Sequence, residues 1–233
     1  MKKPFSVGSL CTISFRTLIL LLLWLCLDQT AFATAVPDAT TFIPKPGLRI
    51  FATGILGSDG TRFEKTLVTA KQDGEPFVTE AETELTYIEY NKLPQQVPEA
   101  RAVWRYAALE NGIAKDPILN QRGYKKYFWL PNNVSIGTQW KASWGYKREI
   151  METGVTVETP AGRFEGCIMV EYDVYAGGTG IERHYIAPGV GLVKTVSLKG
   201  PNATKGTTWY EVQRIETIPE EEARRIVRQM LGL

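Results

Sequence analysis

The chain has 233 residues, with 27 Lys and Arg, 25 Asp and Glu and a single His, so its formal net charge is +2. This balance weighs against a nucleic-acid partner, because affinity for nucleic acid depends on many Lys and Arg side chains that neutralise phosphates. A single His excludes every His-rich metal site, and the chain has no Asp-rich loop of the calcium-binding type, so we expect no metal and no other cofactor.

Residues 1–35 have the pattern of a cleaved export signal. The start is positively charged, an apolar run covers 17–27, and Ala-x-Ala cleavage sites follow within 31–35. The apolar run is shorter than the ~20 residues that a membrane span needs, and it ends at Asp28. We therefore predict a periplasmic or secreted protein that has no stable membrane span after signal cleavage.

The lead-in that follows, residues 36–47, contains three prolines. Proline fixes the backbone and removes a hydrogen-bond donor, which predicts an extended segment. Residues 48–233 are then expected to form a single β-rich domain.

The middle of the chain predicts a succession of β-strands separated by turns. Residues 140–147 alternate apolar and polar side chains with a period of two, as do residues 168–174, which is typical of half-buried strands. Asn111-Gly112 is a strong hairpin signal, because both residues tolerate positive φ. Turn signals spaced by about 8–12 residues predict a sandwich, a barrel or a curved sheet. Further strands are expected over 48–56, 62–70, 77–90, 103–110 and 209–215.

One hairpin allows a prediction of register. Gly177-Gly178 favours a two-residue turn, which places Val174 opposite Ile181. The same register makes His184 the cross-strand partner of Glu171. We therefore expect a structural role for His184.

The end of the chain predicts a helix over 218–231. Thr217 and Glu220 have the spacing of a capping box, and the acidic residues precede the basic ones in the order that complements the helix dipole. The apolar stripe is small, which favours docking on the domain's own sheet over binding to a membrane surface.

Sequence signals of catalysis are weak. The chain has no Gly-x-Ser-x-Gly elbow, and the glycines of 189–194 lack the third glycine and the helix of a dinucleotide site. Glu82 and Glu84 share a strand face, as the carboxylates of a glycosidase could, but such pairs are more often solvated. Cys167 is expected to be a small buried hydrophobe. We predict no catalytic residues and no enzymatic activity.

Two segments carry a resemblance. Residues 159–167, TPAGRFEGC, and 184–194, HYIAPGVGLVK, resemble a pattern in exported bacterial proteins of uncharacterised function. The resemblance implies an antiparallel, strongly curved sheet similar to the half-barrels of periplasmic lipoprotein carriers, and it implies no catalytic residues. The sequence departs from the pattern at Ile186, where a second Tyr is common, and it lacks the lipidated Cys of many members.

Together these observations predict a mainly β fold: a curved antiparallel sheet, as a half-barrel or open barrel, with a short C-terminal helix. The aromatic content favours a non-enzymatic binding or carrier protein that holds an apolar, lipid-like ligand on the concave face, although the same aromatics would fill an ordinary core. Two alternatives stay open: a structural or assembly protein that binds an envelope partner protein, and a hydrolase acting on envelope polymers. The candidate ligand-binding residues are Tyr127, Trp129, Trp140, Trp144, Tyr146 and Tyr172.

Overall fold

The computed structural model describes residues 37–56, 61–90, 93–96, 100–120, 125–142, 146–173, 180–198 and 206–233. Residues 1–35 and 36–233 are separate units, and the fold is that of the second. The predicted export signal, Trp144 and the predicted Gly177-Gly178 turn lie outside the described residues. Among the described residues, no helix combines the length and the apolar character needed to cross a membrane.

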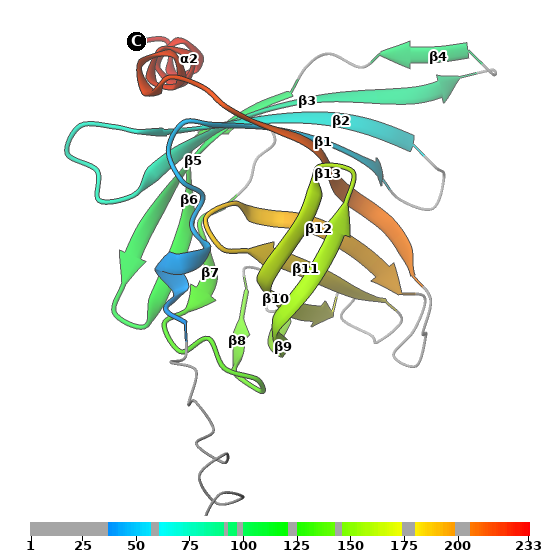
Figure 1. Ribbon diagram of the computed structural model, residues 1–233. Helices are drawn as coiled ribbons and strands as arrows, with labels where there is room; N and C mark the ends of the chain where they lie inside the picture. Colours follow the sequence, from blue (N-terminus) through cyan, green and yellow to red (C-terminus); the bar gives the residue numbers. More distant parts are fainter. Residues whose placement is uncertain are drawn as a thin grey trace, which may run out of the picture. The chain divides into compact units, whose positions relative to one another are not determined.

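The described unit consists of one large sheet, a short 3-10 helix at its start and an α-helix at its end (Figure 1). The elements in chain order are η1 (Ala39–Phe42), β1 (Leu48–Leu56), β2 (Thr61–Lys71), β3 (Val78–Tyr90), β4 (Leu93–Gln96), β5 (Ala100–Leu109), β6 (Gly112–Asn120), β7 (Tyr127–Pro131), β8 (Gln139–Lys141), β9 (Lys147–Thr159), β10 (Gly162–Asp173), β11 (Ile181–Ala187), β12 (Gly191–Leu198), β13 (Thr207–Thr217) and α2 (Glu220–Leu231).

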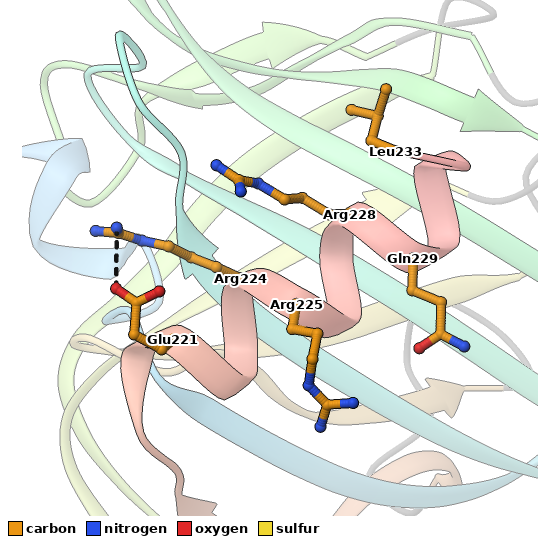
Figure 2. A pocket seen from close by; sticks show the side chains of 6 residues that line it. All are labelled: Glu221, Arg224, Arg225, Arg228, Gln229 and Leu233. Carbon is orange, nitrogen blue, oxygen red and sulfur yellow. Dashed lines mark hydrogen bonds and ion pairs between the residues drawn. The ribbon is translucent and has the colours of Figure 1, made fainter.

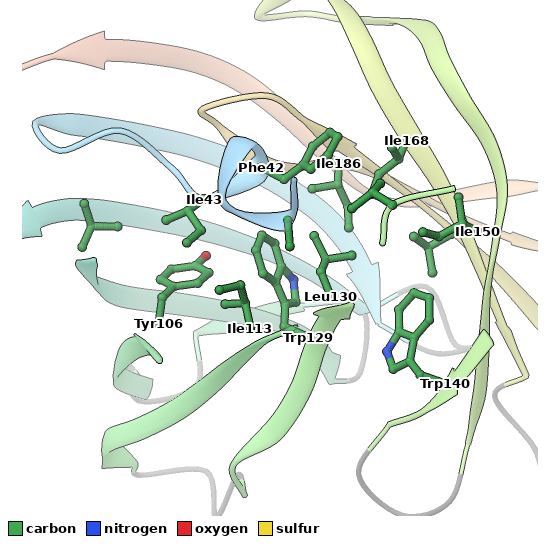
Figure 3. Close-up of a cluster of buried hydrophobic side chains, with 14 residues drawn as sticks. Phe42, Ile43, Tyr106, Ile113, Trp129, Leu130, Trp140, Ile150, Ile168 and Ile186 are labelled. Carbon is green, nitrogen blue, oxygen red and sulfur yellow. The ribbon is translucent and has the colours of Figure 1, made fainter. Parts of the chain in front are cut away.

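The sheet is antiparallel and curls into a nearly closed, barrel-like form. Its strands follow the order β7-β6-β5-β3-β2-β1-β13-β12-β11-β10-β9-β8, with β4 paired to β3. The two end strands, β7 and β8, share no ladder within the described residues. Buried side chains gather where these ends approach each other, among them Trp129, Leu130, Trp140 and Ile150 (Figure 3). The predicted curved antiparallel sheet with a short C-terminal helix is thereby confirmed.

The segment TPAGRFEGC forms the turn of the β9–β10 hairpin and the start of β10. Ala161 N donates a hydrogen bond to Thr159 Oγ1 at 3.1 Å, and Gly162 takes a φ of 127° that side chains rarely adopt. Cys167, five residues further on, is completely buried, as predicted.

The lead-in is partly helical rather than extended. Asp38 Oδ1 accepts a hydrogen bond from Thr40 N at 2.9 Å and caps η1, whose Phe42 is completely buried. Lys45 N then donates a hydrogen bond to Gly189 O at 2.8 Å, which joins the lead-in to the β11–β12 turn. The proline content therefore predicted the wrong conformation over 39–42, because the cap and the buried aromatic side chain favour a turn of helix.

Helix α2 docks on the outer face of the sheet, as predicted. Ala223 and Val227 are completely buried. The N-cap is Pro219, which makes no side-chain capping bond, so the predicted capping box at Thr217 is wrong. The sheet residues in the same buried cluster are Val68, Ala70, Ala81 and Val103.

The predicted single strand over 140–147 is instead two strands of a hairpin. Strand β8 ends at Lys141, β9 begins at Lys147, and Trp140 pairs with Arg148 across the ladder. Trp140 is 8% exposed while Lys141 and Lys147 are exposed, so the alternation holds at these three positions; Tyr146 is half-buried, and Trp144 lies outside the described residues. An alternation that continues from one strand of a hairpin into the next cannot be distinguished from that of one strand.

The β10–β11 register differs from the prediction by one residue. Tyr172 lies opposite Glu182, and Glu171 lies opposite Arg183 instead of His184. Glu171 Oε1 accepts a hydrogen bond from Arg183 Nε at 2.7 Å on the outer face. His184 and Glu182 therefore face the inside of the sheet. The prediction assumed an apolar inner face, and that assumption does not hold.

Candidate functional site

The inner face of the curved sheet holds a partly enclosed cavity of about 430 Å³. Its volume lies within the range of roughly 300–1,000 Å³ that is typical of small-molecule sites. Aromatic and aliphatic side chains form much of the wall, and charged side chains form the rest.

Strand alternation explains which side chains reach the cavity. Successive residues of a strand point to opposite faces, so Glu80 and Glu82 point inward while Ala81 packs beneath α2 on the outer face. The same alternation on β5 directs Trp104 inward and Val103 toward the helix. Both faces of these strands are therefore covered, and the polar residues occupy the inner one.

Lys65 joins two carboxylates at one side of the cavity. Its Nζ lies 2.8 Å from Glu82 Oε1 and 3.2 Å from Glu84 Oε2, and Trp104 Nε1 donates to Glu82 Oε2 at 3.2 Å. Burial raises the pKa of Glu82, but the charge and hydrogen bond of Lys65 outweigh burial and hold that pKa below its usual range. The expected solvated face for Glu82 and Glu84 is wrong: they are 7% and 3% exposed.

A second ion pair lies beside the first. Lys115 Nζ is 2.7 Å from Glu80 Oε1, and Tyr106 OH donates to Glu80 Oε2 at 3.1 Å. The Lys115 ammonium also lies 5.0 Å from the centre of the Tyr106 ring and 5.3 Å from that of Trp104. Burial lowers the pKa of Lys115, but the charge of Glu80 more than reverses this effect and keeps the ammonium charged.

Glu182 is the centre of a third polar group. It accepts a hydrogen bond from Tyr172 OH, and its Oε2 lies 3.1 Å from His184 Nε2. The rings of Tyr172 and His184 meet edge to face at 4.4 Å. Burial lowers the pKa of His184, and Glu182 offsets this only in part, so the imidazole is neutral at pH 7.

Arg148 contributes the remaining cation of the lining. Its guanidinium lies 5.0 Å from the ring centre of Tyr172 and 5.4 Å from that of Tyr127. Such cation–π contacts favour a charge near an aromatic face without neutralising it.

The candidate residues predicted from the sequence divide into three sets. Tyr127, Trp129 and Tyr172 line the cavity. Trp140 is buried in the cluster where the sheet ends approach each other, and Tyr146 is half-buried away from the lining. Trp144 lies outside the described residues.

Sequence reasoning missed the charged part of the lining. Its members come from strands far apart in the chain, so no local motif links them. The alternation of Glu80, Glu82 and Glu84 along one strand was the one available signal. It indicates that the three side chains share a face, but it does not indicate whether this is the inner or the outer face of the sheet. The missed charged residues are Lys65, Glu80, Lys115, Arg148 and Glu182.

A second hollow, of about 480 Å³, lies against α2 (Figure 2). All of its lining side chains come from the helix and the residues just after it. Arg224 in this hollow already bonds Glu220 at 2.7 Å and Glu221 at 3.3 Å. A surface between side chains of one helix offers no enclosed binding volume, so the candidate site is the cavity in the sheet. Within the described ranges, no group of three His, Cys, Asp or Glu side chains can hold a metal ion.

The fold and the site define a β-sheet protein with a small internal cavity of mixed apolar and charged lining. No protein-family model matches the sequence, and no curated protein matches it. A candidate exported protein with a YmcC-like fold from Bacteroides fragilis NCTC 9343 is 14% identical and has a TM-score of 0.46, covering 76% of this chain and 99% of that one. A candidate lipoprotein from Parabacteroides distasonis ATCC 8503 is 14% identical and has a TM-score of 0.42, covering 77% of this chain and all of that one.

Proposed function

We propose that the chain is an exported, non-enzymatic binding or carrier protein that holds a lipid-like ligand inside its curved sheet. The observation that carries the proposal is the cavity of about 430 Å³, which opens among aromatic and aliphatic side chains. A structural or assembly protein would instead be expected to fill this space with side chains. The proposed partner is therefore a small apolar or amphipathic molecule.

The lining suits such a ligand on energetic grounds. Phe63 and Tyr210 stack with ring centres 6.5 Å apart, and Leu67 and Leu192 extend the apolar wall. Each Å² of apolar surface removed from water stabilises a complex by about 25 cal/mol. The buried lysines already have carboxylate partners, so an apolar chain can enter without isolating their charges.

A fluorescent fatty-acid probe tests binding by the delipidated protein. We expect saturable fluorescence that unlabelled fatty acid displaces. Leu192→Trp places a large ring in the cavity wall and should abolish the signal. Ile118→Trp adds the same ring at an exposed site on β6 and should leave the signal unchanged. Absence of saturable binding by the wild-type protein would refute the proposed function.

Export is tested separately. The sequence motivates cleavage after Ala33 or Ala35. N-terminal sequencing of the protein recovered from the periplasm or medium should start just after one of these residues. An intact Met1 in a membrane fraction would contradict a periplasmic or secreted location.

One observation favours a hydrolase as the second candidate. His184 is hydrogen-bonded to Glu182 at the cavity wall, and a neutral imidazole oriented by a carboxylate can act as a general base toward water. A His184→Gln variant separates the two candidates. Retained ligand binding with no loss of any hydrolytic activity supports the binding protein, whereas loss of a measured hydrolytic activity in a folded variant supports the hydrolase.

A further inference from the structure

Arg148 lines the cavity but, unlike the two lysines, has no ion-pair partner among the described residues. Lys65 and Lys115 each lie within 3 Å of a carboxylate oxygen. No carboxylate of the described residues forms an ion pair with Arg148, and its buried Nε has no hydrogen-bond partner there. Arginine stays protonated at every physiological pH, so this charge persists inside the cavity.

The nearby anion is already engaged. Glu182 bonds Tyr172 OH and His184 Nε2, and it acts on Arg148 only through space. The guanidinium makes cation–π contacts with the rings of Tyr127 and Tyr172. Rings supply no hydrogen-bond acceptor for the five N–H groups of the guanidinium, and a buried donor without an acceptor is destabilising.

A second donor without an acceptor lies on the neighbouring strand. Trp140 is 8% exposed, sits directly opposite Arg148 in the β8–β9 ladder, and its Nε1 has no hydrogen-bond partner among the described residues. Trp140 does not line the cavity, so the donor that a ligand in the cavity can reach is the Arg148 guanidinium, which calls for an acceptor from outside the described residues. A negatively charged oxygen satisfies both the hydrogen-bond and the charge requirement.

We propose that the ligand is an amphipathic anion whose carboxylate or phosphate group binds the Arg148 guanidinium while its apolar chain lies along the Phe63–Leu192 wall. The inference rests on the proposed function and adds the chemistry of the head group. The planar guanidinium matches both groups, because it can donate two parallel hydrogen bonds to two oxygens. A neutral head group would leave the charge unpaired.

Matched ligands test the inference by displacement of the neutral dye Nile red from the delipidated protein. Decanoate and decyl phosphate carry the two anionic groups, decanol carries the same chain without charge, and inorganic phosphate carries the charge without the chain. The variants are Arg148→Gln, which removes the cation, and Arg148→Lys, which keeps the charge without the planar fork. Arg183→Gln is the control, because this arginine bonds Glu171 on the outer face.

The wild-type protein and the Arg183→Gln control should bind one or both anions about tenfold or more tightly than decanol. Arg148→Gln should lose this preference while it still binds decanol, and Arg148→Lys should keep part of it.

Equal affinity of the wild-type protein for anions and decanol would overturn the head-group inference while leaving the proposed function intact. So would an Arg148→Gln variant that keeps the preference, or one that loses anions and decanol alike. Displacement by inorganic phosphate as strong as by decyl phosphate would overturn the amphipathic ligand, and failure of the wild-type protein to bind Nile red or any chain would refute the proposed function itself.

Discussion

Lys115 and Glu80 form an ion pair that reaches across an intervening strand of the sheet. Lys115 belongs to β6 and Glu80 to β3, with β5 between them, and their Nζ and Oε1 atoms are 2.7 Å apart. The Trp104 and Tyr106 rings of β5 lie close to the ammonium. The two side chains are 12% and 7% exposed, so the pair depends on the protein rather than on water for its solvation.

Removing one charge of this pair should lower the free energy of unfolding strongly. Removing both charges together should lower it by less than the sum of the two single changes. Lys115→Met leaves the Glu80 carboxylate buried without its cation, and we expect a loss of about 3–5 kcal/mol in the free energy of unfolding. The double variant Glu80→Gln, Lys115→Met should lose clearly less than the sum of the two single variants in urea denaturation.

The exposed pair Arg163–Glu165 is the matched control for that cycle. Its side chains are 61% and 72% exposed, and its coupling should not exceed about 1 kcal/mol. Strict additivity at Glu80 and Lys115 would mean that the two charges are not solvated by each other.

The second prediction concerns stability toward acid. Burial lowers the pKa of His184, with Glu182 opposing and Arg148 adding to the effect, so the unfolded chain binds a proton near pH 6.5 that the folded chain does not. The free energy of unfolding should therefore fall as the pH drops from about 7 to 5. The lowered pKa values of Glu82 and Glu182 add a loss at still lower pH, since the stabilisation by these carboxylates is complete above their unfolded pKa and is lost as the pH falls through their folded pKa.

A His184→Gln variant isolates the first part of this pH dependence. Urea denaturation at several pH values should show a flatter profile between about pH 7 and 5, with the loss at lower pH that comes from Glu82 retained. Parallel profiles for the wild-type protein and the variant would show that His184 titrates alike in the folded and unfolded chains.

Local patterns predicted the features that depend on local chemistry. The buried Cys167 and the docked amphipathic helix each follow from a few neighbouring residues. Alternation also placed Trp140 correctly on the buried side, although it could not show that the chain reverses before Lys147.

Long-range pairing decided what local patterns could not. Glu80 and Glu82 look like solvated residues until Lys65 and Lys115, from two other strands, are placed beside them. Helix α2 covers the outer face of the sheet at Ala81, so the carboxylates of Glu80 and Glu82 do not point to solvent on that face. The β10–β11 register failed for the same reason: the inner face includes paired polar groups, so matching of apolar faces was the wrong criterion.

The third prediction concerns the reactivity of Cys167. Burial raises the pKa of its thiol to about 11, and Sγ donates a weak hydrogen bond to Phe164 O at 3.5 Å. Thiolates rather than thiols react with disulfide reagents, so the native protein should be almost inert at pH 8. Cys11 and Cys26 lie in the predicted signal, so the cleaved protein should release one equivalent of chromophore from Ellman's reagent, and only after urea is added. Rapid labelling without urea would contradict the buried position.

The last prediction compares two glycines of nearly equal backbone conformation. Gly191 has a φ of 85° and Gly137 a φ of 84°, so alanine at either site should cost about 1–2 kcal/mol in backbone strain. Their surroundings differ. A Cβ at Gly191 would lie 3.1 Å from Pro44 Cγ, whereas a Cβ at Gly137 would meet nothing within 4 Å.

Pro44 belongs to the lead-in, which a backbone hydrogen bond joins to the β11–β12 turn. Gly191→Ala should therefore also weaken the packing of the lead-in against this turn. We expect its loss in free energy of unfolding to exceed that of Gly137→Ala by about 1 kcal/mol or more in urea denaturation. Limited proteolysis should also cut the lead-in of Gly191→Ala faster than that of Gly137→Ala, because a displaced Pro44 exposes the segment to protease. Equal losses and equal cleavage rates would show that the lead-in does not depend on close contact with Gly191.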